Sequence, residues 1–176
     1  RTIALRVTNS NGLSSISTST LTIENARPTA SVTGPKTAVR GQDLTFFFGG
    51  HDISTVDNSA GLKFLVDFGD DVTTTVGAFN GSTTSSVTHA WFQDGIYTLT
   101  VSSMDKDGGI SDPVTLTVEI RSVAILNDPF ETGATALYVV GSHLGDTIVI
   151  APVGNTDDVE VRINGQSQGT YSVSAN

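Results

Sequence analysis

Apolar and polar residues alternate along most of the chain in short runs, a pattern typical of β-strands. The clearest run is 62–68, where Leu62, Phe64, Val66 and Phe68 occupy every second position and would share one face of a strand. Segments rich in Gly, Asn, Asp and Pro separate the runs, as turns between strands do. The pattern predicts an all-β chain whose further central strands are 29–33, 44–48, 73–78, 82–88, 96–101 and 114–120.

One strand–turn–strand segment occurs twice. Residues 3–23 match residues 99–120, and the separation is 96 residues before a one-residue insertion at Gly109 and 97 residues after it. That separation is the size of one β-sandwich domain. The matched positions are, in order, Ile3, Leu5, Asn9, Ser10, Asn11, Gly12, Leu13, Leu21 and Ile23 in the first copy and Leu99, Val101, Asp105, Lys106, Asp107, Gly108, Ile110, Val118 and Ile120 in the second.

The repeat predicts the domain organisation. Residues 1–24 would be the last hairpin of a preceding similar domain, and residues 25–28 a linker, because Pro28 cannot donate a ladder hydrogen bond. Residues 28–120 would form one antiparallel β-sandwich, since short strands separated by closely spaced turns favour two packed sheets. Residues 121–176 would be the incomplete start of a different β-rich module.

The composition narrows the class of function. A formal net charge of -9, from 18 acidic against 9 basic residues, argues against nucleic acid or an anionic membrane as a partner. The chain has no cysteine, which excludes disulfides, Cys-based zinc sites and thiol nucleophiles. No apolar run approaches the ~20 residues of a membrane-spanning helix, and residues 1–7 alternate as a strand does, unlike a signal peptide.

Four motifs in 28–120 together resemble the PKD (polycystic kidney disease) domain family. They are Phe64-x-Val66-x-Phe68-Gly69-Asp70, His89-x-Trp91, Gly95-x-Tyr97-x-Leu99-x-Val101 and Asp105-x-Asp107-Gly108. The resemblance implies an Ig-like β-sandwich and a non-catalytic extracellular module, which serves as a spacer, an adhesive or force-bearing unit, or an accessory to secreted hydrolases. It also implies that His89 stands at the start of a strand, where we expect a ring nitrogen to bond a backbone group.

The chain departs from the family pattern at three positions. Val66 stands where the family has a core Trp, Asp71 where it has Gly, and Trp91 where it has Tyr. We expect Phe46, Phe48 or Trp91 to fill the volume that Val66 leaves. These departures leave the expected fold intact, but they weaken any transfer of ligand properties.

The carboxylates fall into two groups at opposite ends of the expected sandwich, because alternate loops lie at opposite ends. Asp67 ends one strand and Asp70 and Asp71 follow it, and we expect Asp70 to accept backbone N–H bonds in the turn after Gly69. The other group is the candidate calcium site, since calcium takes six to eight oxygen ligands and would stiffen the hinge to a preceding domain. A solvated hairpin turn is the alternative. The candidate ligands are Asn25, Asp52, Asp57, Asp105 and Asp107.

The C-terminal segment carries a weaker signal. Gly141, Asp146 and Ile148 match three positions of the calcium-binding nonapeptide, but Leu144 stands where that motif needs a Gly. One degenerate copy cannot form a stacked calcium roll, so we expect an ordinary β-meander. Asn164-Gly165 predicts a hairpin turn within it.

No nucleophile elbow, zinc-protease motif or phosphate loop occurs, so we expect no enzyme. The function expected is a structural spacer or adhesion module of a large extracellular or cell-surface protein, with calcium as its one candidate cofactor. Its partners would be neighbouring domains, copies of itself or surface glycans. Two alternatives stay open: a filament subunit in which 1–24 completes a neighbour's sheet, and a carbohydrate-binding accessory of a secreted hydrolase.

Overall fold

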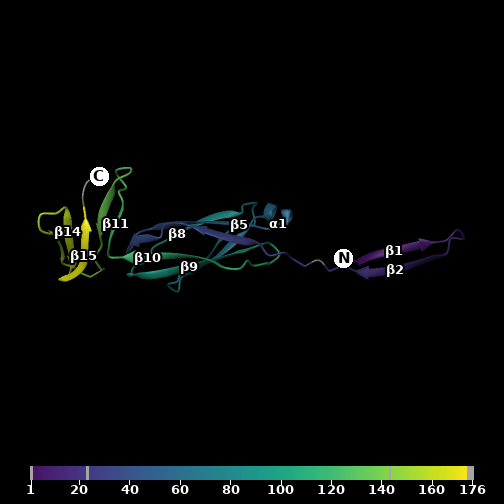
Figure 1. Cartoon of the computed structure of the whole chain (residues 1–176). Helices are drawn as coiled ribbons and strands as arrows, with labels where there is room; N and C mark the ends of the chain where they lie inside the picture. The colour runs from purple at the N-terminus through teal and green to yellow at the C-terminus, as the bar shows by residue number, and fades with distance from the viewer. Residues whose placement is uncertain (1, 23, 143, 174–176) are drawn as a thin grey trace.

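The structure is a computed structural model that describes residues 2–22, 24–142 and 144–173. Apart from one short helix, the regular elements of the described residues are strands, as the alternation predicts, and three parts follow one another in space (Figure 1). They are an N-terminal hairpin, a central β-sandwich and a C-terminal β-module. Ile23, which closes the first copy of the repeat, and His143 lie outside the described residues. Within the described residues, no helix has the length and apolar character needed to cross a membrane.

The N-terminal hairpin stands apart from the rest of the chain. Its strands β1 (Thr2–Thr8) and β2 (Ser14–Thr20) pair antiparallel, with Leu5 opposite Ser17. Every residue of both strands is exposed. Residues 24–28, which end at the buried Pro28, lead into the sandwich (Figure 1).

The central domain is an antiparallel β-sandwich with one parallel pair. One sheet has the order β4-β10-β9-β6-β7, and the other has the order β3-β5-β8. Strand β4 pairs parallel to β10, and all other pairs in the two sheets are antiparallel. The strands are β3 (Thr29–Thr33), β4 (Thr37–Val39), β5 (Leu44–His51), β6 (Lys63–Asp67), β7 (Thr73–Gly77), β8 (Thr84–His89), β9 (Gly95–Met104) and β10 (Val114–Arg121).

The core lies where the alternation places it. Leu62, Phe64, Val66 and Phe68 are all buried on the inner face, while Asp67 is exposed. The same core cluster as Val66 contains several aromatic rings. They include Phe46, which meets Trp91 edge-on at 5.8 Å, and Phe48, which lies 5.8 Å from Phe64 between ring centroids.

Two short elements differ from the sequence prediction. Residues 49–61 lie between two predicted strands and contain helix α1 (Thr55–Ala60), which Ser54 caps by accepting a bond from the Asp57 backbone N–H. Residues 34–43 also lie between two predicted strands, and they contain strand β4. Both were missed because three or six residues are too few to show a period.

The chain enters and leaves the sandwich at opposite ends. Strand β3 begins at Thr29, opposite His51, beside α1. Strand β10 ends near Ile120, opposite Gly95, at the far end of the domain. A single residue, Ser122, then separates β10 from the next strand, so the C-terminal module follows the sandwich directly (Figure 1).

The C-terminal module has two small sheets around its own core. Strands β11 (Val123–Asn127) and β12 (Thr135–Val139) form a hairpin, and the remaining three strands form an antiparallel meander. Val123, Val161 and Ile163 are buried between the two sheets. The meander strands are β13 (Ile148–Pro152), β14 (Asp158–Ile163) and β15 (Gln166–Ser172).

Candidate functional site

The candidate site is the N-terminal end of the sandwich, where the linker meets the turn between β9 and β10. Asp105 organises this turn and is 1% exposed. Its Oδ1 accepts bonds from the backbone N–H groups of Asp107 at 2.8 Å and Gly109 at 2.9 Å. Its Oδ2 accepts a bond from Asn25 Nδ2 at 2.8 Å. Asp105 therefore fastens the linker to the last hairpin of the domain.

Two further buried carboxylates come from the α1 region. Asp52 Oδ1 accepts a bond from the Ser54 backbone N–H at 2.7 Å, and Asp52 is 1% exposed. Its Oδ2 is buried and makes no hydrogen bond within the described part of the chain. Asp57 lies in the first turn of α1 and is 3% exposed. Burying carboxylates is costly unless donors or cations compensate them, so both need partners.

Lys106 supplies the compensating positive charge. Its Nζ lies 2.9 Å from Asp57 Oδ1 and also contacts the Asp107 carboxylate. Hydrogen bonds to Asp107 and then to Asp57 raise the pKa of Lys106. Bonds from Ser54 and Lys106 lower the pKa of Asp57. Lys106 and Asp57 therefore form a charged pair at neutral pH.

The arrangement differs from an open calcium site. The structure brings Asn25, Asp57, Asp105 and Asp107 to one end of the sandwich. Asn25, Asp57 and Asp107 line a hollow of about 500 Å³ there, which also borders Glu24. However, the described residues contain no group of three or more His, Cys, Asp or Glu side chains that could hold a metal ion. Lys106 occupies the place between two of the carboxylates. The calcium assignment stays a prediction.

The carboxylates at the opposite end have structural contacts. Asp67 Oδ1 accepts from the Gly69 N–H at 2.8 Å, and Asp70 Oδ1 accepts from the Val72 N–H at 3.3 Å, so both shape the turn after β6. His89 differs from its expected role, because its Nε2 bonds Asp70 Oδ2 at 2.8 Å instead of a backbone group. The imidazole also stacks on Phe68 at 4.0 Å. This pairing places a side-chain acceptor where none was expected.

The C-terminal end of the sandwich is tied to the next module. Arg40 Nη2 donates to the Val140 carbonyl at 2.8 Å, and its Nε lies 3.0 Å from Asp94 Oδ1. The Val140 N–H donates to the Ser122 carbonyl at 2.8 Å. Residues from both parts thus hold this junction, whereas Asn25 is the linker residue that bonds the N-terminal end.

The weak nonapeptide match in the C-terminal module corresponds to a turn. Asp146 accepts bonds from Ser142 and from Asn164 Nδ2, the latter at 2.6 Å, and these bonds lower its pKa. Asn164 and Gly165 both have positive φ, as the predicted hairpin turn requires. The carboxylate of Asp146 is thus used to join two turns of the module.

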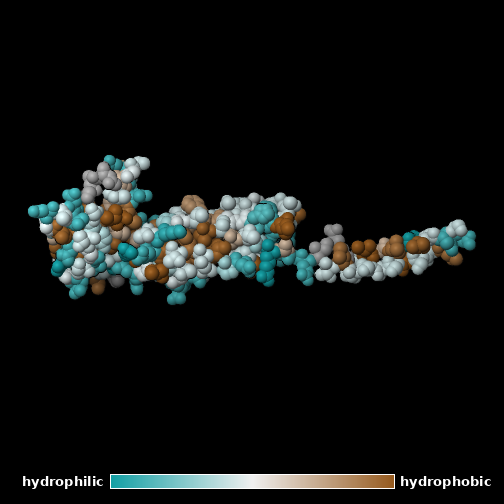
Figure 2. Space-filling model, viewed as in Figure 1, coloured by the Kyte–Doolittle hydropathy of each residue, from teal (hydrophilic) through white to brown (hydrophobic). Residues whose placement is uncertain are grey.

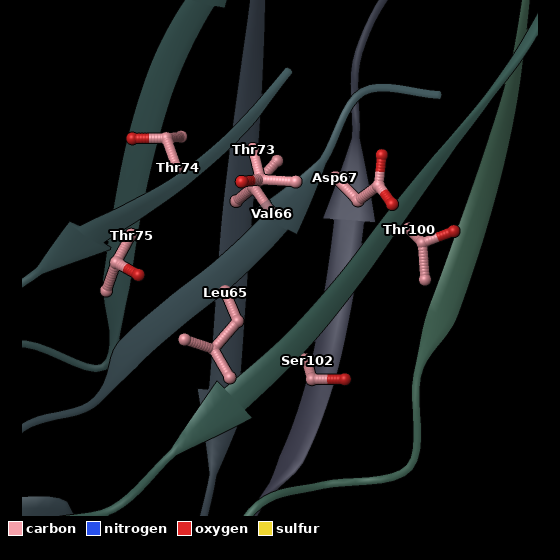
Figure 3. A pocket seen from close by; sticks show the side chains of 8 residues that line it. All are labelled: Leu65, Val66, Asp67, Thr73, Thr74, Thr75, Thr100 and Ser102. Atoms are coloured by element: carbon pink, nitrogen blue, oxygen red, sulfur yellow. The ribbon is translucent and has the colours of Figure 1, made fainter. Parts of the chain in front are cut away.

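A hollow of about 590 Å³ lies on the outer face of the five-stranded sheet (Figure 3). Leu65 is opposite Ser102 and Asp67 is opposite Thr100 in the pair of β6 with β9, so these side chains lie on neighbouring strands. Asp67 is the one titratable side chain in the lining. A general acid and base pair cannot be formed by these lining residues alone. The remaining members are Val66, Thr73, Thr74 and Thr75.

The sequence contained signals for the residues that were missed. Ser54 stands three positions before Asp57, the spacing of a helix N-cap followed by an acidic residue in the first turn. Lys106 lies between two aspartates in the repeated turn, which favours an ion pair over a free carboxylate cluster. Both signals are local and could have been used. The bond from Asp70 to His89 joins distant segments, and no local pattern indicates it.

Comparison with known proteins gives one family. A model of the PKD domain family matches residues 25–120. No curated protein matches. Among solved structures, the PKD domain of an M14-like peptidase from Thermoplasmatales archaeon SCGC AB-540-F20 is 23% identical, with a TM-score of 0.49, over 55% of this chain and 98% of that one.

Two solved structures of the CARDB domain of PF1109 from Pyrococcus furiosus are more distant. They are 11% and 14% identical, with TM-scores of 0.42 and 0.40. The alignments cover 56% and 58% of this chain, and 97% and 95% of theirs. The family model spans more than half of the chain and contains all four motifs and the whole β-sandwich. The chain therefore belongs to the PKD domain family.

Proposed function

We propose that this chain is a non-catalytic spacer of a large extracellular or cell-surface protein, which holds its neighbours apart along one axis. The observation that carries the proposal is the path of the chain through the sandwich. The chain enters beside Thr29 and leaves after Ile120 at the opposite end. Domains with this connectivity extend a tandem array by their own length, and do not fold back on themselves.

The two junctions support the same role. At the C-terminal end, Arg40 and Ser122 bond the following module, and Val123 is buried directly after β10. At the N-terminal end, Asp105 holds the linker through Asn25. A spacer needs such fixed junctions, because a free hinge would let the neighbouring parts approach each other.

The site chemistry supports a non-catalytic role. The carboxylates at the N-terminal end are paired with Lys106 or with backbone donors, and Asp67 has no second titratable group beside it in the hollow of Figure 3. Members of the PKD family are usually found in extracellular proteins, which supports the proposed location.

The carbohydrate-binding alternative has less support. A glycan platform needs an exposed planar aromatic ring. Trp91 is 1% exposed and stacks with the half-buried Tyr97 at 5.3 Å between centroids, so both belong to the core. The strongly exposed rings of Phe92 and Phe130 belong to different parts of the chain, the sandwich and the C-terminal module. Adhesion to a protein surface is compatible with the fold, but no described feature favours a particular receptor.

Calcium stiffening of the linker is kept as a narrower hypothesis. The buried, unbonded Oδ2 of Asp52 favours it, because a cation would satisfy that atom. Lys106 opposes it, because an ion that binds Asp57 and Asp107 must first displace the ammonium group. We therefore expect calcium to act at this end only in competition with Lys106.

The absence of cysteine from the sequence allows a direct test of the spacer role. Spin labels on Thr55→Cys in α1 and Glu131→Cys in the C-terminal module report the distance across the sandwich and its C-terminal junction. We expect one narrow distance distribution. A broad distribution, as wide as that of the same pair in the urea-unfolded chain, would overturn the proposal.

A further inference from the structure

The N-terminal hairpin has an apolar side that nothing in the structure covers. Ile3, Leu5 and Val7 alternate along β1 and are 58%, 65% and 61% exposed. Their cross-strand partners on the same face are serines 19, 17 and 15 of β2. Figure 2 shows apolar surface along the length of the hairpin. An isolated two-stranded hairpin is marginally stable in water, so this face needs a partner.

The hairpin has the same strand register as β9–β10. Ile3 is opposite Ser19, and their counterparts in the repeat, Leu99 and Leu116, are opposite each other. One pair further along, Leu5 faces Ser17 as Val101 faces Val114. The structural repeat therefore extends to the pairing of the strands and is not confined to the sequence match.

The two turns are also built alike. Asn9 Oδ1 accepts bonds from the backbone N–H groups of Asn11 and Leu13, both at 3.0 Å, as Asp105 Oδ1 does from the residues two and four positions after it. Gly12 and Gly108 both take a positive φ, 80° and 88°. Because both turns have the same bonds at the same positions, the similarity of the two hairpins is not explained by chance.

The docked hairpin β9–β10 shows what covers such a face. The counterparts of Ile3, Leu5 and Val7 are Leu99, Val101 and Ser103, and all three are 0% exposed. Leu99 and Val101 belong to the core cluster that contains Phe48 and Phe64. The opposite face agrees too, because Thr18 and Thr20 correspond to the exposed Thr115 and Thr117 of β10.

We propose that the apolar face of β1–β2 docks on the β-sandwich body of a second PKD-type unit, which precedes it in the same polypeptide, as the last hairpin of that unit. The partner surface is an open apolar core formed by counterparts of β3, β5 and β6. The proposal rests on the proposed function only for the tandem arrangement, and it adds the partner and its surface.

The side chains of the hairpin disfavour a second copy of this same domain as the partner. Ser17 and Ser19 stand where β10 has the half-buried Val114 and Leu116, and Val7 stands where β9 has Ser103. If the β1–β2 hairpin replaced β9–β10 in this domain, Ser17 and Ser19 would leave cavities, and Val7 would be too large for the space that Ser103 occupies. The preceding unit should therefore carry larger side chains opposite the two serines.

The native polypeptide provides the test. Its intact mass should exceed that of these 176 residues. In that longer chain, hydrogen exchange at the β1 amides should be slower than in the isolated chain of residues 1–176 by about 100-fold or more, because a docked strand opens only with its domain. A native mass equal to that of the 176 residues, or equal exchange in both chains, would overturn the proposal.

Two substitutions at neighbouring positions in the longer polypeptide test the two faces of the hairpin separately. Leu5→Asp places a charge on the face expected to be buried, whereas Arg6→Asp places one on the opposite face. We expect Leu5→Asp to lower the Tm of the preceding unit and Arg6→Asp to leave it unchanged. Equal shifts would contradict the proposed docking. Failure here would leave the spin-label result on the spacer role unaffected, because that measurement does not involve the hairpin face.

Discussion

Ala38 lies opposite Ile120 in the parallel pair of β4 with β10, and both side chains are buried. Backbone bonds flank the pair, from the Glu119 N–H to the Lys36 carbonyl at 2.8 Å and from the Arg40 N–H to the Arg121 carbonyl at 3.1 Å. Tension on a tandem array pulls β4 toward the N-terminal end and β10 toward the C-terminal end. It therefore loads these bonds in shear, all at once.

We expect Ala38→Pro to lower the force at which the sandwich unfolds, because proline removes an N–H from the shorter strand of this pair. The measurement is single-molecule stretching of the full chain. Val66→Ala is the matched control, since it weakens the core without touching the β4–β10 pair. If both variants lower the force in proportion to their loss of equilibrium stability, the β4–β10 pair is not the element that resists tension.

The aromatic core predicts a large difference between two phenylalanines of the same sandwich. Phe64 is 0% exposed and lies 5.8 Å from Phe48 between ring centroids, whereas Phe47 is 59% exposed. Phe64→Ala should cost about 3–5 kcal/mol of unfolding free energy. Phe47→Ala should change it by less than about 0.5 kcal/mol. Urea unfolding measures both, and similar losses would mean that the assigned core face is wrong.

The sequence predicted the fold well in strands where buried and exposed residues alternate. The face shared by Leu62, Phe64, Val66 and Phe68 was fixed by a period of two, and the structure confirms it. Strand β4 could not be predicted from three residues, because its position depends on the parallel pairing with β10, more than 70 residues away in sequence. Contacts between distant segments determine such elements, and no local pattern records them.

The sequence predicted where the candidate site lies better than it predicted which groups bond there. Alternation of the loops placed Asp105 at the end of the sandwich where the linker begins, and the structure has it bonded there to Asn25. The predicted backbone partner of His89 was wrong, because the imidazole bonds the Asp70 carboxylate in the turn after β6 of the other sheet. The role of Lys106 was missed, since counting oxygen ligands leaves out the side chain that already neutralises them.

The cluster around Lys106 predicts a pH dependence with two limbs. The pKa of Asp57 is lowered, so its contribution to stability is complete above the unfolded value of 3.8 and is lost as the pH falls through the lower folded pKa. The pKa of Lys106 is raised, so its contribution is complete below 10.5 and is lost as the pH rises through the folded pKa. Lys106→Met should lower the Tm between these limits and flatten both limbs.

The control for this cluster is an exposed ion pair in the C-terminal module. Arg162 lies 3.1 Å from Glu160 and is 51% exposed, so Arg162→Met should change the Tm less than Lys106→Met does. Thermal melts from acidic to alkaline pH measure both variants. Equal Tm losses would show that the Lys106 cluster behaves as an ordinary surface pair.

Calcium and the Lys106 ammonium group would compete for the same carboxylates, and the Lys106→Met variant tests whether they do. We expect the Tm of the unsubstituted chain to be the same in EDTA and in calcium, because the ammonium group already neutralises Asp57 and Asp107. Lys106→Met should make the Tm rise with calcium. A calcium-dependent Tm in the unsubstituted chain would instead support the narrower hypothesis of an ion-stiffened linker.

Asp71, which stands where the family has glycine, has a backbone conformation that glycine would adopt with less strain. Asp71 has φ 67°, in the left-handed region that favours glycine, and its side chain is exposed beside Asp70. Asp71→Gly should raise the unfolding free energy by about 0.5–1 kcal/mol. Asn164→Gly is the contrast, because Asn164 also has a positive φ, 53°, but its side chain bonds the Thr147 N–H and Asp146. Losing those two bonds should make Asn164→Gly destabilising, so urea unfolding should give changes of opposite sign.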